Sequence, residues 1–478
     1  MQRKLLSGLF WVLLANVLVK PLWLLGVEVG VQNVVGNEMY GFYISIFNLS
    51  YILNILLDLG ITNYNTRNIA RHPQLIGKHL SGILGIKLCL LALYVVITFS
   101  VGALLGYRSA EFRLLAWLCL AQGLNSLILY LRSNFEGLLL FRWDSLFSVL
   151  DRVLMILICG TMIWSPLRQH FNIMWFVYAQ VVAYALTAIL ALAVIGHKAG
   201  LRRIHWDWRF FAVVLKQSAP FALLVLLMAS YNRLDPILLR RMASDAAAGI
   251  YAGAFRLLDA LSMIAYLVSV PLLPVFARQC KEGDPSEVAS TVRMVFPAVM
   301  AFAVTAAVTL SAISTDVMQL LYPGQGMQYA PVFRVVVYGI IPICITYVFG
   351  TLLTADGRLL QLNIFASVSL ILNVLVNIIL IPHLGAVGSA WASLTAQGFM
   401  AIAQLLVAAH IFSLTPRDLR LWPLVAFTAA ILVANHIATC LTGIWWHLIL
   451  VAVLAIALVC LMRMVDVRQL LTLATNRQ

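Results

Sequence analysis

The residues of this chain that could carry chemistry are charged side chains inside long apolar runs. Lys20, Arg233 and Arg256 each lie within such a run. A charge at the centre of a bilayer costs about 2.5–3.5 kcal/mol on insertion scales, so such residues are retained mainly where they are paired, hydrated or functional. Three cations of this kind suit an anionic ligand, because charge-assisted hydrogen bonds are the strong ones.

The three cations are predicted to lie at one depth. With the first helix ending at residue 27, each cation lies roughly seven residues, or about 10 Å, from the outer end of its helix. Pro21 and Pro236 lie beside two of these positions, and a proline inside a helix frees a carbonyl one turn back. Polar groups in a broken helix are tolerated where they line a cavity. We therefore expect Lys20, Arg233 and Arg256 to point into a central cavity.

Two acidic residues accompany these cations. Asp259 follows Arg256 by one helical turn on the same face, and Asp235 lies close to Arg233. We expect both acids to hold the arginines in an empty cavity and to release them when an anion binds. Alternatively, the charges are only structural: Asp235 neutralises Arg256 across a hairpin, and Lys20 snorkels outward.

Four more polar residues inside apolar runs are weaker candidates for the same cavity. Asp58 lies near the cytoplasmic end of the second run, where it also fits a boundary position. Lys87 is expected to snorkel to the cytoplasmic face. Asn373 and Asn377 are typical of hydrogen bonds between membrane helices.

The composition defines the elements that hold these residues. The chain has 478 residues, of which 63% are apolar and 10% charged, whereas soluble domains carry roughly 25% charged residues. This excludes a soluble fold, and the high hydrophobicity excludes disorder. The apolar runs are continuous rather than alternating, which excludes a β-barrel. About 14 runs of roughly 20 residues predict an all-α polytopic membrane protein with about 14 transmembrane helices.

The loop charges predict the orientation of these helices. Lys and Arg are concentrated in alternate loops, and the loops rich in them include the N-terminus. Such loops face the cytoplasm. An even number of helices then places both termini in the cytoplasm. The first apolar run follows Arg3 and Lys4 and is too long for a signal peptide, so we expect it to be retained as a helix.

An internal repeat predicts the domain organisation. Gly41-Phe42-Tyr43 opens the second apolar run, and Gly249-Ile250-Tyr251 opens the eighth. An even number of helices separates the copies, so they run in the same direction, as in transporters built from parallel repeats. We predict an N-terminal lobe of six helices (1–196), a cytoplasmic amphipathic linker (197–217), a second six-helix lobe (218–411), and two extra helices with a cytoplasmic tail (412–478).

Motifs for catalysis do not occur in the sequence. It contains no HExxH, Walker or GxSxG motif and no Cys/His cluster with metal-ligand spacing. We therefore expect a transporter rather than an enzyme, with no metal or cofactor, and leave open a coupling ion, H⁺ or Na⁺. The net charge of +14 and the basic, aromatic linker indicate contact with membrane lipids rather than nucleic acid.

Three blocks carry a family resemblance: Val35 to Tyr43 with Leu57-Asp58-Leu59-Gly60, Asn232 to Pro236 with Gly249 to Leu257, and Leu372 to Ala390. The chain resembles polysaccharide-export flippases of the O-antigen type, which belong to the multidrug/oligosaccharidyl-lipid/polysaccharide (MOP) exporter superfamily. The resemblance implies a two-lobed flippase that uses alternating access in the bacterial inner membrane. Its substrate would be an oligosaccharide on undecaprenyl diphosphate, for O-antigen or exopolysaccharide synthesis, and its partners a polysaccharide polymerase and a chain-length protein.

The resemblance also bears on single residues and on the alternatives. The block from Tyr251 to Leu257 is similar to the one that carries an essential arginine in the peptidoglycan-precursor branch, which gives that role to Arg256. The drug-exporter branch often keeps an aspartate in its first helix, whereas this first helix has Lys20. A cation-coupled small-molecule exporter is therefore the alternative function, and a membrane-embedded glycosyltransferase or polymerase a more distant one.

Overall fold

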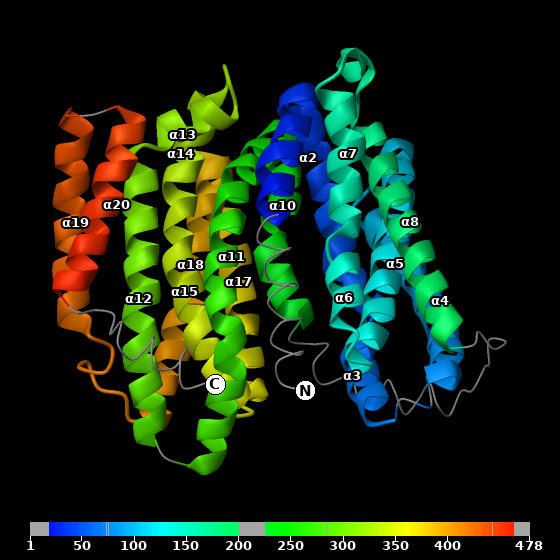
Figure 1. Ribbon diagram of the computed structural model, residues 1–478. Helices are drawn as coiled ribbons and strands as arrows, with labels where there is room; N and C mark the ends of the chain where they lie inside the picture. Colours follow the sequence, from blue (N-terminus) through cyan, green and yellow to red (C-terminus); the bar gives the residue numbers. More distant parts are fainter. Residues whose placement is uncertain are drawn as a thin grey trace. The chain divides into compact units, whose positions relative to one another are not determined.

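The described part of the chain is entirely helical. The computed structural model describes residues 19–72, 74, 76–199, 225–283, 285–441 and 443–462, and none of these residues lies in a β-strand. The prediction of an all-α polytopic membrane protein is confirmed. The chain divides into two compact units, Met1–Ala252 and Gly253–Gln478, each built of long helices packed side by side (Figure 1).

The first unit contains mostly long helices joined by short connections. Its elements are η1 (Leu22–Glu28), α2 (Val29–Leu53), η2 (Asn54–Leu57), α3 (Ile61–Arg71), α4 (Ile76–Leu104), α5 (Ser109–Gly137), α6 (Phe141–Phe147), α7 (Leu150–Ile163), η4 (Pro166–His170), α8 (Ile173–Ala199) and α10 (Asp235–Met242). Helix α11 (Asp245–Glu282) begins in this unit and continues into the second.

The second unit contains the remaining helices. They are α12 (Pro285–Ala312), α13 (Ser314–Leu321), α14 (Gly326–Val336), η5 (Val337–Gly339), α15 (Ile340–Ile345), η6 (Thr346–Gly350), α16 (Thr351–Ala355), α17 (Leu359–Leu384), α18 (Ala386–Ile411), α19 (Leu421–Leu441) and α20 (Ile444–Leu461). At one edge of this unit, α19 and α20 pack against each other and against α12 (Figure 1).

Twelve helices of the described residues are long and apolar enough to cross a membrane. The first of them, Val19–Leu57, covers parts of two predicted spans. The apolar run at 218–239, which we expect to be the seventh span, begins among residues 200–224, and these lie outside the described residues. The count of about 14 therefore stays a prediction, as does the linker at 197–217. The compact units part at Ala252. In the first unit, α10 packs against α2, and Gly249 at the start of α11 lies against the backbone of Asn37.

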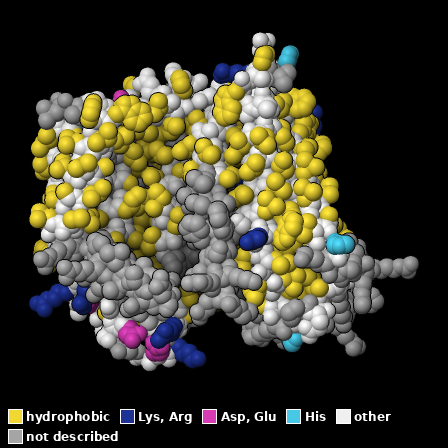
Figure 2. Space-filling model, viewed as in Figure 1, with side chains coloured by type: hydrophobic (Ala, Val, Ile, Leu, Met, Phe, Trp, Pro, Cys, Tyr) yellow, Lys and Arg dark blue, Asp and Glu magenta, His cyan; other side chains and the backbone are white. Residues whose placement is uncertain are grey.

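The helices present apolar side chains outward as well as inward. On α20, Ile449, Val453 and Ile456 are exposed while Val451 and Ala455 are buried. Figure 2 shows hydrophobic side chains along the sides of the helices, with most of the visible charged side chains near their ends. A helix that is hydrophobic all round is the form expected in a membrane.

Candidate substrate-binding site

The first helix ends much later than the sequence predicted. From Val19 the helix continues through η1 and α2 to Gly36, where φ of 82° and ψ of 167° interrupt it. Lys20 is roughly 16 residues from this point, or about 24 Å along the helix. The predicted distance of about 10 Å from the end of the first helix is therefore wrong for Lys20. The polar residues after 27 resembled a loop, but Gln32 is buried within the helix and donates to the Gly249 carbonyl oxygen at 2.8 Å.

Lys20 lies in a region of charge that the sequence analysis did not recognise. It interacts electrostatically with Arg152, Arg132 and Asp151. Arg152, at the start of α7, donates to the Tyr184 hydroxyl at 3.0 Å, and its Cζ lies 5.5 Å from the centre of the Trp23 ring. Trp23 lies in η1, which is a π-helix that follows Pro21. Short π-helical segments are frequent at functional sites.

Arg152 was missed because Asp151 and Arg152 have the pattern of an exposed loop ion pair. The structure places both within α7, with Asp151 buried. The nearby Arg132 forms a separate ion pair, with 2.7 Å between its Nε and Asp144 Oδ1. Arg152 differs from an exposed loop arginine in its contacts with Trp23 and Tyr184, which lie far from it in the sequence.

Arg233 and Asp235 lie at a helix break in the first unit. Helical residues 225–233 end at the bend of Leu234, and α10 starts with Asp235, followed by a proline at its first turn. The Arg233 guanidinium lies over the Tyr51 ring at 5.6 Å. Asp235 is fully buried, and its Oδ2 accepts a hydrogen bond from the Tyr251 hydroxyl at 2.7 Å. The expected break at Pro236 is present, and Tyr251 is a partner of Asp235 that the sequence analysis did not identify.

Arg256 belongs to the second unit and is buried there. Its Nη1 donates to the Tyr322 hydroxyl at 2.7 Å, and that hydroxyl donates to the Gly253 carbonyl oxygen at 3.3 Å. Tyr322 stacks on Tyr329 with 4.0 Å between ring centres. Asp259, one turn further along α11, is half-buried, and its carbonyl oxygen accepts from the Ser262 hydroxyl at 2.7 Å. An aromatic pair thus fixes one end of the Arg256 guanidinium.

The expectation that Lys87 snorkels to the cytoplasmic face is wrong. Lys87 is buried, and its Nζ lies 2.6 Å from Asp58 Oδ1, with further hydrogen bonds to the Leu57 carbonyl oxygen and the Ser126 hydroxyl, both at 2.9 Å. Asp58 also accepts from the Thr62 hydroxyl at 2.6 Å. The helix breaks between η2 and α3 at Asp58, so the ion pair connects this break to the interior of α4.

Asn377 forms a hydrogen bond between helices, and Asn373 bonds to Asn377 within the same helix. Asn377 Nδ2 donates to the Asn373 carbonyl oxygen at 2.9 Å within α17. The Ser389 hydroxyl of α18 donates to Asn377 Oδ1 at 2.8 Å. Both asparagines are fully buried, which favours a role in joining α17 to α18.

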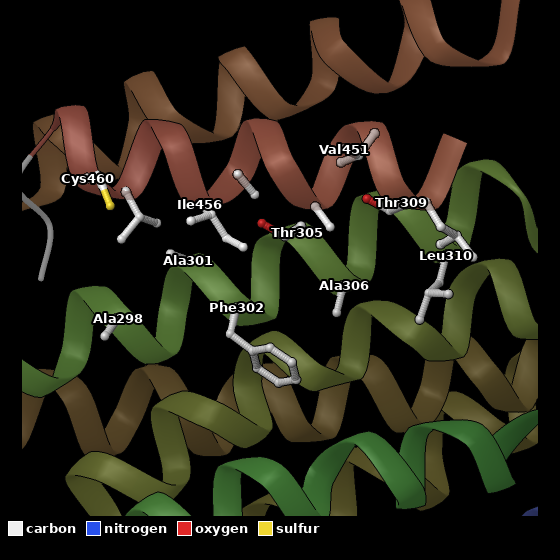
Figure 3. Close-up of a pocket in the computed structure, with 14 residues that line it drawn as sticks. Ala298, Ala301, Phe302, Thr305, Ala306, Thr309, Leu310, Val451, Ile456 and Cys460 are labelled. Carbon is white, nitrogen blue, oxygen red and sulfur yellow. The ribbon is translucent and has the colours of Figure 1, made fainter. Parts of the chain in front are cut away.

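A cavity of about 450 Å³ lies between α12 and α20 in the second unit. None of the described residues that line it is charged, so it suits hydrocarbon rather than a charged group. Figure 3 shows the hydroxyls of Thr305 and Thr309 on the side of α12 that faces α20. Among the described residues, no group of three or more His, Cys, Asp or Glu is arranged to hold a metal ion.

Comparison with known proteins agrees with this architecture. The profile of a family described as "Polysaccharide biosynthesis protein" matches residues 5–279. This is more than half of the chain, so the chain belongs to the polysaccharide biosynthesis protein family. No curated protein matches it.

Solved structures share the fold at low sequence identity. The lipid II flippase MurJ in an inward closed conformation matches with a TM-score of 0.74 and 12% identity, over 98% of this chain and 99% of that chain. An inward-facing multidrug resistance MATE family transporter of the MOP superfamily matches with a TM-score of 0.66 and 13% identity, over 84% and 98%. A MOP superfamily transporter from Pyrococcus furiosus, described as having a binding pocket of reverse polarity, matches with a TM-score of 0.59 and 14% identity, over 86% and 95%. The chain therefore has the fold of MOP superfamily transporters.

Proposed function

We propose that this protein is a flippase that moves undecaprenyl-diphosphate-linked oligosaccharide from the inner to the outer leaflet of the bacterial plasma membrane by alternating access. The family and the fold support a lipid-linked flippase in general. The observation that carries the proposal further is the sign of the charges inside the helices. Lys20 of the first helix and Arg152 beside it are cations, which suit a diphosphate and repel a cationic drug.

Lys20, Arg233 and Arg256 are the proposed diphosphate-binding residues, with Asp235 and Asp259 as the acids that balance them. Lys20 and Arg233 lie in the first unit and Arg256 in the second. Arg233 lies over the Tyr51 ring, and Arg256 donates to the Tyr322 hydroxyl. Arginine fits this role because its planar fork binds a phosphate through two hydrogen bonds. A polymerase and a chain-length protein are the proposed partners.

A cation-coupled small-molecule exporter of the same superfamily is the second candidate, because MATE transporters share the fold. Such an exporter needs a carboxylate that an ion or drug can reach. In this chain Asp58 is held by Lys87 and Asp235 is fully buried. The ion pair of Asp58 and the burial of Asp235 favour the flippase over the exporter.

The decisive experiment is transport by the purified full-length protein in proteoliposomes. Undecaprenyl-diphosphate-linked oligosaccharide is placed in one leaflet, and its arrival in the other is followed with a lectin or glycosidase that cannot cross the membrane. We expect faster transfer than in protein-free vesicles, with H⁺ and Na⁺ gradients applied in turn to identify the coupling ion. Transfer at the protein-free rate, together with efflux of a cationic dye, would favour the exporter instead.

A further inference from the structure

Lys20 and Arg152 have hydrogen-bond donors that the described protein does not use. Within the described residues, Lys20 Nζ has no hydrogen bond or ion pair, although the side chain is only partly exposed. Of the five N–H donors of an arginine, Arg152 gives one to Tyr184. The distance from its Nε to Asp151 Oδ2 is 3.7 Å, which is too long for a hydrogen bond.

Two aromatic rings hold Arg152 in place. Its Cζ lies 5.5 Å from the Trp23 ring centre and 5.8 Å from the Tyr184 ring centre. Both distances are within the range of a cation–π interaction. Trp23 stacks on Phe176 with 5.9 Å between ring centres, so its own position is fixed. The Arg152 side chain keeps 28% of its surface exposed, so its remaining N–H donors are accessible to a ligand.

Lys20 lies close to the same guanidinium. It is one helical turn before Trp23 and therefore near the face that Arg152 covers. The two like charges repel each other, and in a membrane helix that repulsion needs a compensating anion. Two acids supply a balance in the empty protein: Asp151 beside Arg152, and Glu28, which accepts a hydrogen bond from Trp23 Nε1 at 3.1 Å.

Arg132 interacts with Lys20 electrostatically, but its charge is already balanced by a close ion pair, with 2.7 Å between its Nε and Asp144 Oδ1. We therefore do not include Arg132 in this site. Asp151 differs from Asp144, because its Oδ2 lies 3.7 Å from Arg152 Nε and is too far for a hydrogen bond. Asp151 therefore offsets the charge of Arg152 without occupying that donor.

We propose that Lys20 and Arg152 together bind one phosphate-type anion, with Trp23 and Tyr184 as the residues that position Arg152. Arginine supplies a fork of two parallel N–H donors, and lysine supplies a point charge with three donors, a combination that matches the oxygens of a phosphate group. This rests on the proposed function and adds Arg152 to its binding residues. The anion is either the diphosphate of the lipid-linked substrate or the phosphodiester of an anionic bilayer lipid.

The test is binding to the purified full-length protein in phosphatidylcholine nanodiscs, measured by native mass spectrometry. The two probes are undecaprenyl diphosphate and phosphatidylglycerol. We expect Lys20→Gln and Arg152→Gln each to weaken binding about tenfold, since one charge-assisted contact of about 1.4 kcal/mol corresponds to that factor. Arg152→Lys should recover part of the loss, because it keeps the charge without the fork. The matched control is Arg168→Gln, which removes an exposed arginine of η4 and should bind normally.

The outcomes separate the sources of the anion. Weaker binding of undecaprenyl diphosphate alone identifies the substrate, whereas weaker binding of phosphatidylglycerol alone identifies a bilayer lipid. Tyr184→Phe removes the hydroxyl that accepts from Arg152 and from Gln180, without a change of charge. It should weaken binding of the same probe about threefold if Tyr184 positions Arg152. It also keeps the test usable if Arg152→Gln does not fold.

Unchanged binding of both probes by Lys20→Gln and Tyr184→Phe, with the variants folded, overturns the proposal. That result is distinguishable from failure of the proposed function. If the wild-type protein moves lipid-linked oligosaccharide in proteoliposomes while these variants bind normally, the flippase assignment stands and the Lys20–Arg152 site is wrong. If the wild-type protein moves no lipid-linked oligosaccharide, the proposed function itself fails.

Discussion

Gly41 of α2 and Gly249 of α11 lie in backbone contact, so neither position has room for a side chain. A Cβ on Gly41 would overlap the Asp245 carbonyl oxygen and lie 2.7 Å from Gly249 N, and a Cβ on Gly249 would overlap the Asn37 carbonyl oxygen. These glycines are the first residues of the two copies of the repeated motif. The two copies of the repeated motif therefore pack against each other at their first residues.

Gly249→Ala should destabilise the protein by about 1–3 kcal/mol, because overpacking at a rigid backbone contact cannot be relieved by a side-chain rotation. Thermal unfolding in detergent should show the loss, and flipping in proteoliposomes should fall with it. The control is Gly398→Ala in α18, where a Cβ meets no atom within 4 Å. It should be neutral or stabilising, because alanine is the better helix former. Equal melting temperatures for both variants would contradict the close packing.

Lys87→Met should cost about 3 kcal/mol, because it leaves the largely buried carboxylate of Asp58 without its charged partner. The double variant Lys87→Met/Asp58→Asn should recover much of that loss, since no charge then remains buried. A double-mutant cycle from chemical unfolding in detergent measures the coupling. If the two single changes simply add, the ion pair is not important for stability, and the snorkelling orientation would have to be reconsidered.

Arg256→Ala should abolish export of the glycan while the protein remains in the membrane. Arg256→Lys should restore only part of the export, because a lysine still reaches the Tyr322 hydroxyl but replaces the fork by a point charge. Export is measured by surface-polysaccharide staining of cells that depend on this protein. Arg278→Ala is the control, because Arg278 is exposed and pairs with Glu282 of its own helix. Normal export by Arg256→Ala would remove Arg256 from the proposed site.

The free energy of unfolding should decrease at acidic pH because of Asp418. Burial acts to raise the pKa of this carboxyl group, but hydrogen bonds from Thr415 and Arg293 outweigh it and lower the pKa to about 2. A depressed folded-state pKa stabilises the protein above the unfolded value of roughly 3.9, and this contribution is lost as the pH falls towards 2. Asp418→Asn should therefore lower the melting temperature at pH 7 by the equivalent of about 1 kcal/mol after allowance for solvent screening. The difference from wild type should shrink below pH 4, and a constant difference would contradict the assignment.

Reporter fusions test the predicted orientation. A reporter after Gln478 should report the cytoplasm. One inserted within residues 323–330, which cover the α13–α14 connection and the start of α14, should report the opposite side. The reason is the concentration of Lys and Arg in the loops on the side of the termini. The same side for both reporters would contradict the model of 14 spans with cytoplasmic termini.

The sequence by itself determined the class of protein and most of its helices. For example, the apolar runs of the sequence at 112–131, 360–381 and 387–411 lie within α5, α17 and α18. The prediction of these helices succeeds because the length of an apolar run is a local property of the sequence, and the thickness of the bilayer sets that length directly. The repeated motif at Gly41 and Gly249 could also be identified from the sequence alone, because it is a similarity between two sequence segments.

Only the tertiary structure decided which side chains meet. Lys20 lies far from the Gly36 end of its helix because polar residues such as Gln32 are buried by other helices instead of ending the helix. Lys87 turns to Asp58, and Arg152 to Trp23 and Tyr184, across large sequence separations. A partner of this kind depends on the rotation and packing of whole helices, and no local pattern of residues encodes either.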